Sequence, residues 1–420
     1  MWTDEEAGRM KKIRNWLSKY SVELMVGIFL LYSVYINRAD NIYSYVKAWY
    51  VIDYSYGFGS RLLIGSLLHL LCGEVVTDAA AYCFVVASLC LLSVAVALFA
   101  GYIYRRGTNQ EVKKAVLFLI VFYIASPASP EYLWTVENMG RLDAYLFLLT
   151  VLMAFVYFGI RNVRIKYLLF TILGVMAVFI HQVYFFLFFP FLCVMILQNL
   201  WKSGWDKRNV ICAVCSVCCI GGVFLYMQFG SGIYDDYATL MARLNAHTDL
   251  SVDGAPMEAE YFWTLKDHFY KNMMPEIPHH LKYGFMLVCM LVPVWGTYLW
   301  VWVHAIRHSH KRQKLKYVLM LCTNIAYLPV FILMNDWGRW FAALFVVGFL
   351  DIMLLAGDED EGVCHALEIM GGVFSRNPMP FILLILYIAT FEKFEGLNFP
   401  EQVTDFYYTT YYLKNWLLHR

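Results

Sequence analysis

The chain has 420 residues, of which 60% are hydrophobic and only 15% are charged, and its mean hydropathy is +0.55. A soluble domain carries about 25% charged residues, so the composition excludes soluble, collagen-like and disordered proteins and predicts an all-α polytopic membrane protein. The net charge of +1, from 33 basic and 32 acidic residues, gives no basic surplus, so we expect no nucleic-acid partner.

The N-terminus has a basic segment followed by an apolar run near 22–36. The basic residues are Lys11, Lys12, Arg14 and Lys19. No small-residue cleavage site follows the apolar run. The order is typical of an uncleaved first spanning helix that starts in the cytoplasm.

Apolar runs of membrane-spanning length recur along the rest of the chain. A spanning helix needs about 20 mostly apolar residues. The runs lie at 20–37, 79–104, 112–128, 141–160, 165–181, 183–200, 208–228, 283–304, 315–334, 338–356 and 379–393. We therefore expect a single transmembrane domain, residues 1–420, with about eleven spanning helices.

The apolar run 62–72 is about half a span long, and its role follows from the basic residues. If it spanned the membrane, the later basic loops would lie outside. If it lies along the outer interface as a juxtamembrane helix, these loops fall in the cytoplasm, as the positive-inside rule requires. We predict the second arrangement. It makes 38–78 the first external loop and 229–282 a large external loop, interpreted as a lid.

The remaining cytoplasmic loop, 357–378, is acidic, and its run Asp358–Glu361 is predicted to be a solvated turn.

Four cysteines, Cys212, Cys215, Cys218 and Cys219, cluster in one apolar run. No histidine or carboxylate lies beside them, so we interpret them as small packing residues rather than metal ligands. No metal or cofactor is expected.

Charged residues at helix mouths are the candidate site residues, because charge inside a bilayer is costly. Asp53 and Arg61 bracket DYSYGFGSR in the first external loop. They are a candidate base and anion clamp, or else an ion pair that holds the loop to the bundle. Glu137, Arg141 and Asp143 lie at the mouth of run 141–160, as site residues or interfacial anchors. Arg141 and Asp143 are two residues apart, so we expect them on different helix faces.

Two further groups complete the predicted site. His181 and Gln182 lie at an external helix end, where they could hold a phosphate or sugar oxygen. The alternative for His181 is a satisfied core histidine.

The segment NDWGRW supplies the other group, with Asp336, Trp337, Arg339 and Trp340. Arginine has a planar fork suited to phosphate, and tryptophan offers a stacking face for a sugar or prenyl unit. The alternative is an aromatic belt with a snorkelling arginine.

A first helix followed by an external acidic loop and a juxtamembrane helix resembles the GT-C superfamily of polytopic glycosyltransferases, which use polyprenyl-phosphate-linked sugars. DYSYGFGSRLLIG, MGRLD, IHQ and NDWGRW also resemble patterns in bacterial envelope proteins of this type. The loop lacks the adjacent acidic pair seen in mannosyltransferases of the superfamily. Asp40 therefore competes with Asp53 for the role of base, and we prefer Asp53 because it is closer to the glycine-rich turn.

The resemblance implies a glycosyltransferase in the bacterial cytoplasmic membrane, with a cytoplasmic N-terminus and an extracytoplasmic active site. Its partners would be a polyprenyl-phosphate sugar donor, a glycan or lipid acceptor, and membrane lipids. Asp53 would be the catalytic base. Arg339, Arg61 and Arg141 would hold the donor phosphate. The residues predicted to contact acceptor or sugar are Asp143, Glu137, His181, Gln182, Asp336, Trp337 and Trp340.

Three other functions stay open. A repeat-unit polymerase or ligase of the Wzy type would favour a long external loop with several arginines, whereas 229–282 has only Arg243. A transporter or flippase for a lipid-linked sugar would favour internal repeats or helices broken at mid-membrane. A membrane acyltransferase would use a histidine as its base.

Overall fold

The computed structural model describes residues 4–230, 232–395 and 401–418 and is almost entirely helical. The first half contains α1 Asp4–Lys19, α2 Ser21–Asn37, η1 Ser44–Tyr50, β1 Gly57–Phe58, α3 Leu62–Cys72, α4 Asp78–Arg106, α5 Gln110–Ala125, η2 Pro130–Trp134, α6 Asp143–Gly159, α7 Val163–Ile180, α8 Tyr184–Leu187, α9 Phe189–Lys202 and α10 Lys207–Phe229. The second half contains β2 Gly232–Ile233, α11 Tyr237–Ala246, α12 Ala255–Phe262, α13 Leu265–Asp267, η3 His268–Met273, α14 Met274–Met290, α15 Val292–Arg307, α16 Lys311–Cys322, η4 Thr323–Tyr327, α17 Leu328–Leu333, α18 Trp337–Gly357, α19 Glu361–Arg376, α20 Met379–Ala389 and α21 Glu401–Leu418.

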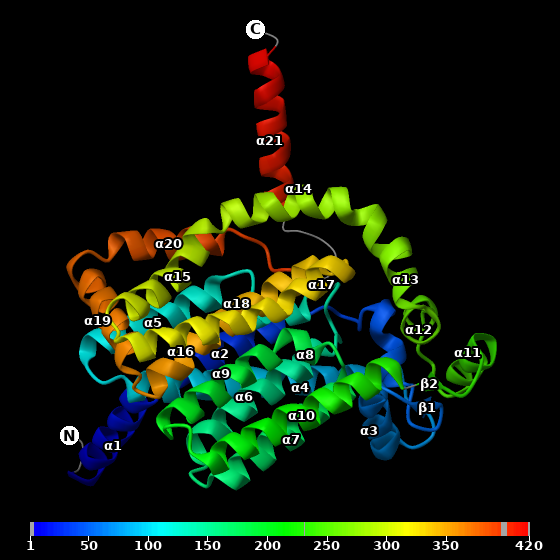
Figure 1. Cartoon of the computed structure of the whole chain (residues 1–420), viewed down its shortest axis with the longest axis horizontal. Helices are drawn as coiled ribbons and strands as arrows, with labels where there is room; N and C mark the ends of the chain where they lie inside the picture. Colours follow the sequence, from blue (N-terminus) through cyan, green and yellow to red (C-terminus); the bar gives the residue numbers. More distant parts are fainter. Residues whose placement is uncertain (1–3, 231, 396–400, 419–420) are drawn as a thin grey trace.

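The described part of the chain contains six helices long and apolar enough to cross a membrane, or up to nine if three bent pairs each form one span. This confirms an all-α polytopic architecture. The bent pairs are α1 with α2, α14 with α15, and α19 with α20. Figure 1 shows most of the apolar helices running side by side, with α21 standing apart from them.

The short helix α3 does not carry the chain across the bundle. Helices α2 and α4, on either side of it in sequence, are antiparallel neighbours. Arg38 at the end of α2 donates to Tyr82 near the start of α4, at 3.0 Å. At the opposite end, Glu23 of α2 pairs with Arg105 of α4. Both ends of the segment 38–77 therefore lie at the same end of the bundle, as the prediction of a non-spanning 62–72 requires.

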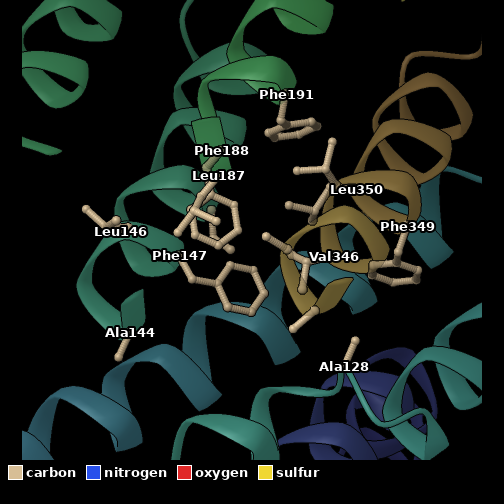
Figure 2. Packing of buried hydrophobic residues seen from close by; sticks show 14 of the residues in the cluster. Ala128, Ala144, Leu146, Phe147, Leu187, Phe188, Phe191, Val346, Phe349 and Leu350 are labelled. Carbon is tan, nitrogen blue, oxygen red and sulfur yellow. The ribbon is translucent and has the colours of Figure 1, made fainter. Parts of the chain in front are cut away.

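Packing of large apolar side chains fixes α6, α9 and α18 against one another. Figure 2 shows Phe147 of α6 and Phe188 beside Val346 and Leu350 of α18. The rings of Phe147 and Phe188 stack with centroids 5.7 Å apart, and all four side chains are buried. Close-packed interiors of this kind resist small displacements. The packing therefore holds the first turns of α6 and α18, which carry Asp143 and Arg339, in a fixed relation.

The predicted lid packs on the first predicted external loop. Strands β1 and β2 pair antiparallel, with Gly57 opposite Ile233 and Phe58 opposite Gly232. The Tyr261 hydroxyl donates to the Ser60 carbonyl oxygen at 3.0 Å. Of the predicted 229–282 loop, residue 231 lies outside the described residues, and residues from Met274 onward belong to α14. The two loops thus form one layer across an end of the bundle.

The predicted acidic loop 357–378 is wrong, because most of it is the helix α19. Helix α19 buries one face, formed by Val363, Leu367 and Met370. Glycines and charged residues lie between these positions, so the sequence contains no continuous apolar run there. The predicted solvated turn is also wrong. Asp358 accepts hydrogen bonds from Tyr157, Gln198 and Lys202, and Asp360 is buried against Lys316 and Tyr317.

The bundle has two chemically different ends. We call the end that carries α3, β1, β2 and α12 the loop-rich end, and the opposite end, which carries Arg106, Arg164, Lys202, Arg208 and Arg312, the basic end (Figure 1). Within the described residues, every predicted site residue lies at the loop-rich end, in the first turns of α6 and α18 or on the segments that precede or follow the helices there.

Candidate active site

Four charged side chains from two separate segments form a compact network, which we call the Arg339 cluster: Arg141, Asp143, Asp336 and Arg339. Arg339 binds Asp143 through two parallel hydrogen bonds, Nε to Oδ2 and Nη2 to Oδ1, each 2.7 Å long. Arg339 also pairs with Asp336, and Arg141 Nη1 lies 3.5 Å from Asp336 Oδ2. Asp143 is 1% exposed and Arg339 7% exposed. Fork-to-fork pairing of this kind is among the strongest that side chains make.

The expectation that Arg141 and Asp143 lie on different helix faces is wrong. Helix α6 begins at Asp143, so Arg141 lies before it in a turn and helix-face geometry does not apply. Gly140 adopts a φ of +90°, which favours glycine. The Arg141 backbone N–H donates to the Asn138 carbonyl oxygen at 2.9 Å. This turn directs both side chains into the same network.

A second network centres on Arg61 and Glu260, and we call it the Arg61 cluster. Arg61 Nη2 lies 2.7 Å from Glu260 Oε2, and its guanidinium stacks 4.6 Å from the ring centroid of Trp49. The side-chain N–H of Gln182 donates to Glu260 Oε1 at 2.6 Å, and the Gln182 side-chain oxygen, Oε1, lies 3.2 Å from His181 Nδ1. The cluster joins the first predicted external loop, the end of α7 and helix α12.

Arg61 is held in an uncommon backbone conformation. Its φ is +69°, a left-handed value that costs free energy in a residue with a Cβ atom. Its backbone N–H donates to the Phe179 carbonyl oxygen at 3.0 Å, which fixes the residue against α7. Arg61 Nε is buried without a hydrogen-bond partner within the described residues. Arg61 therefore has both a fixed position and an unused donor.

Charges from both clusters act on two neighbouring groups, Tyr45 and His181. Burial raises the pKa of Tyr45, as does the charge of Asp336, while Arg61 and Arg141 act to lower it. Burial, together with the charges of Arg61, Arg339 and Arg141, lowers the pKa of His181 well below its usual range. His181 is thus a neutral imidazole beside positive charge, a state that can accept a hydrogen bond from a hydroxyl group.

For Asp336, burial and the neighbouring arginines act on the pKa in opposite directions. Its burial acts to raise the pKa of the carboxyl, but Arg339 and Arg141 outweigh that effect and the pKa is lowered. Asp336 is therefore an anion that bridges two arginines.

Asp53 lies at the loop-rich end but outside both clusters. Its Oδ1 atom accepts hydrogen bonds from the Ser55 backbone N–H at 2.8 Å and from the Ser55 hydroxyl at 2.6 Å. Its Oδ2 atom lies 3.8 Å from His69 Nε2. Within the described residues, no hydrogen bond or ion pair joins Asp53 to Arg61 or Arg339. The carboxylate is oriented and partly exposed.

The remaining predicted residues divide between the rim and the core. The Glu137 backbone oxygen accepts from Arg141 Nε at 2.9 Å, and the Glu137 side chain is half-buried. Trp337 donates its indole N–H to the Phe331 carbonyl oxygen and lies near the ring of His280. Trp340 is 2% exposed beneath Arg339, so its ring presents no open face to a sugar in this structure.

Sequence reasoning missed Glu260, Trp49 and Tyr45. Glu260 lies in a polar loop that contains several other acids, and it is far from Arg61 in sequence. Nothing in the sequence pattern marks it out. Tyr45 and Trp49 belong to a chain rich in aromatic residues, so composition cannot single them out.

Within the described ranges, no group of three or more histidine, cysteine, aspartate or glutamate side chains is arranged to hold a metal ion. Comparison with known proteins finds no family model, curated protein or solved structure that matches the chain. The candidate function therefore depends on the chemistry of the two clusters.

Proposed function

We propose that the protein is a membrane glycosyltransferase that moves a sugar from a polyprenyl-phosphate donor to a glycan or lipid acceptor. The observation that carries this proposal is the gathering of Arg61, Arg141 and Arg339 at one end of an apolar helix bundle. Three guanidinium groups in a partly buried setting suit an anionic ligand whose tail lies in the bilayer. A lipid phosphate has both features.

Arg61 is the best placed of the three to hold the donor phosphate. Arg339 is already engaged by Asp143 and Asp336, so we propose that it anchors the site and positions Asp336. Among the described residues, the ionic partner of Arg61 is Glu260, which lies on the loop layer rather than in the bundle. Outward movement of α12 would exchange Glu260 for phosphate.

The proposed reaction is direct transfer at the anomeric carbon. A carboxylate takes the proton of the acceptor hydroxyl, the hydroxyl oxygen bonds to the anomeric carbon, and the bond from that carbon to the phosphate oxygen breaks. The phosphate leaves with the electron pair as polyprenyl phosphate, whose charge the arginines stabilise. We propose Asp53 as the base because its carboxylate is oriented by Ser55 and remains partly exposed.

The proposed active site faces the extracytoplasmic side of a bacterial cytoplasmic membrane. The support is the distribution of charge. The basic end carries the arginines and lysines in and beside the short connections between α4 and α5, α6 and α7, α9 and α10, and α15 and α16. The positive-inside rule assigns this end, with the N-terminus, to the cytoplasm.

The test is release of polyprenyl phosphate from a panel of polyprenyl-phosphate hexoses and pentoses by the purified chain in nanodiscs. Asp53→Asn should reduce turnover by about a hundredfold or more, the scale of general-base catalysis. Asp40→Asn is the matched control, because Asp40 is exposed in the same predicted loop. Loss of turnover in Asp40→Asn but not in folded Asp53→Asn would contradict the assignment of the base.

A lipid-linked-sugar transporter is the second candidate, and two structural features favour it. Helix α16 is interrupted by the 3-10 segment η4 before α17, and α14 bends by 62° into α15. Asp351 is buried within α18, and its Oδ1 atom has no hydrogen-bond partner among the described residues. Transporters often carry broken helices and intramembrane acids. Translocation without release of polyprenyl phosphate would favour this alternative.

A further inference from the structure

A polar cavity lies at the basic end, away from both clusters. It has a volume of about 450 Å³ and opens between the first turns of α7 and α10. Its lining residues are Asn162, Val163, Arg164, Asp206, Arg208, Asn209 and Cys212. The proposed transfer reaction uses none of them.

Helices α7 and α10 both have their N-terminal end at the cavity. Thr171 of α7 donates to Ser216 of α10 at 2.9 Å, and Ile220 of α10 packs closely against Gly174 of α7. The contacts advance together along both helices, so α7 and α10 are parallel and their N-termini lie side by side. The positive ends of two helix dipoles therefore point toward the cavity.

The net charge of the lining residues is positive, like the helix ends that face the cavity. Arg164 and Arg208 contribute two guanidinium groups. Asp206 contributes one carboxylate, which caps α10 by accepting hydrogen bonds from the backbone N–H groups of Arg208 and Asn209 at 3.1 and 3.3 Å. The cavity therefore has a positive formal charge.

Asn209 is an independent indication that the cavity suits a polar ligand. The residue is only 5% exposed and lines the cavity, yet its Oδ1 atom has no hydrogen-bond partner among the described residues. Buried polar atoms are rarely left without a partner. The side-chain amide of Asn209 also carries two N–H donors, which suits a ligand rich in acceptor oxygens.

We propose that this cavity binds a phosphate-bearing anion, namely the headgroup of an anionic phospholipid. Arg164 and Arg208 contact the phosphate oxygens, and Asn209 donates the third contact. The outward sides of the same helices are apolar, with Leu168 and Ile211 more than half exposed. An acyl chain can lie along these surfaces while the headgroup occupies the cavity.

The experiment measures binding of dioctanoyl phosphatidylglycerol to the purified full-length chain, beside inorganic phosphate and neutral dioctanoyl phosphatidylcholine. We expect the double variant Arg164→Gln/Arg208→Gln to bind the anionic lipid at least about tenfold more weakly, a loss of about 1.4 kcal/mol. Arg312→Gln is the matched control, since it removes an arginine at the same end that stacks on Trp201 outside the cavity. It should change binding by less than about twofold.

The probes separate the sources of the anion. Tighter binding of phosphatidylglycerol than of inorganic phosphate assigns the site to lipid, and equal binding assigns it to free phosphate. Equal loss of binding in the double variant and in Arg312→Gln would overturn the proposal, as would equal binding of phosphatidylcholine.

A second measurement uses the unaltered chain and so does not depend on folding of the variants. Cys212 lines the cavity, whereas Cys215 is exposed on the same helix and is not among the lining residues. Bound phosphatidylglycerol should slow maleimide labelling of Cys212 relative to Cys215, with both read by peptide mass spectrometry. An unchanged ratio of the two labelling rates at saturating lipid would contradict the proposal.

Discussion

At the scale of single residues, the pairing of Arg339 with Asp143 is the interaction on which the loop-rich end depends most. Both side chains are buried, and they come from helices whose relative position is fixed by the core around Phe147 and Val346. Removal of one partner from a buried pair leaves an uncompensated charge. The cost of that change is much larger than for a pair in water.

Asp143→Asn should therefore lower the free energy of unfolding by about 3–5 kcal/mol. Asp235→Asn is the matched control, because Asp235 pairs with the partly exposed Arg243 and surface pairs contribute about 0–1 kcal/mol. Thermal unfolding of the purified variants in detergent measures both. Similar melting temperatures for the two variants would contradict a structural role for the buried pair.

His181 makes stability depend on pH. Burial and the nearby arginines hold its pKa well below the usual value of about 6.5. As the pH falls below about 6.5, the unfolded chain binds a proton that the folded chain does not, so stability falls. The slope from this residue is at most about 1.4 kcal/mol for each pH unit.

His181→Gln should flatten the fall in melting temperature between about pH 6.5 and pH 5. His310→Gln, at an exposed position of the basic end, should leave the profile unchanged. The measurement is thermal unfolding in detergent across that pH range. A wild-type profile retained in His181→Gln would show that other groups carry the acid sensitivity.

At the scale of elements, α19 depends on close contact with the start of α5. A Cβ atom added at Gly371 would lie 2.0 Å from the backbone oxygen of Glu111, whereas one added at Gly372 would meet no atom within 4 Å. A backbone oxygen cannot move aside as a side chain can. The two adjacent glycines therefore differ in whether they accept a methyl group.

Gly371→Ala should destabilise the protein by about 1–3 kcal/mol through overpacking. Gly372→Ala should be neutral or stabilise it by up to about 1 kcal/mol, because alanine favours a helix more than glycine does. Thermal unfolding of the two variants compares them directly. Equal effects would mean that α19 does not pack on α5 in this way.

The spanning elements are the part of the fold that the sequence predicts best. Continuous apolar runs mark α4, α10 and α18, and the charge of the short loops predicts a non-spanning role for α3, which agrees with its short length. Helix α19 escaped prediction because only one of its faces is buried. The sequence predicts a solvated Asp360 because its partners in the fold, Lys316 and Tyr317, are distant in sequence.

At the scale of the whole molecule, the sequence predicts which residues gather but not how they pair. Arg61, Arg141, Asp143, His181 and Arg339 all lie at the end of the bundle where helix counting places them. Their partners depend on contacts between segments far apart in the chain. For example, Arg61 meets Glu260 only because the layer formed by 232–273 packs on the first predicted external loop.

The same arrangement gives the two ends of the molecule different proposed ligands. The loop-rich end presents arginines beside acids and a neutral histidine, as transfer chemistry requires. The basic end presents a cavity with two arginines and a buried amide. A polyprenyl phosphate and an anionic phospholipid should therefore bind independently, each sensitive to substitutions at its own end alone.

Whether the loop-rich end binds a lipid phosphate is tested most directly by the dissociation constant of polyprenyl phosphate for the purified full-length chain in phosphatidylcholine nanodiscs. Arg61→Gln should weaken binding at least about tenfold, since it removes a charge-assisted contact of about 1.5–3 kcal/mol. Arg312→Gln should leave the constant within about twofold of wild type. Equal binding by the two folded variants, or no binding by the folded wild-type chain, would contradict the claim that the loop-rich end holds a lipid phosphate.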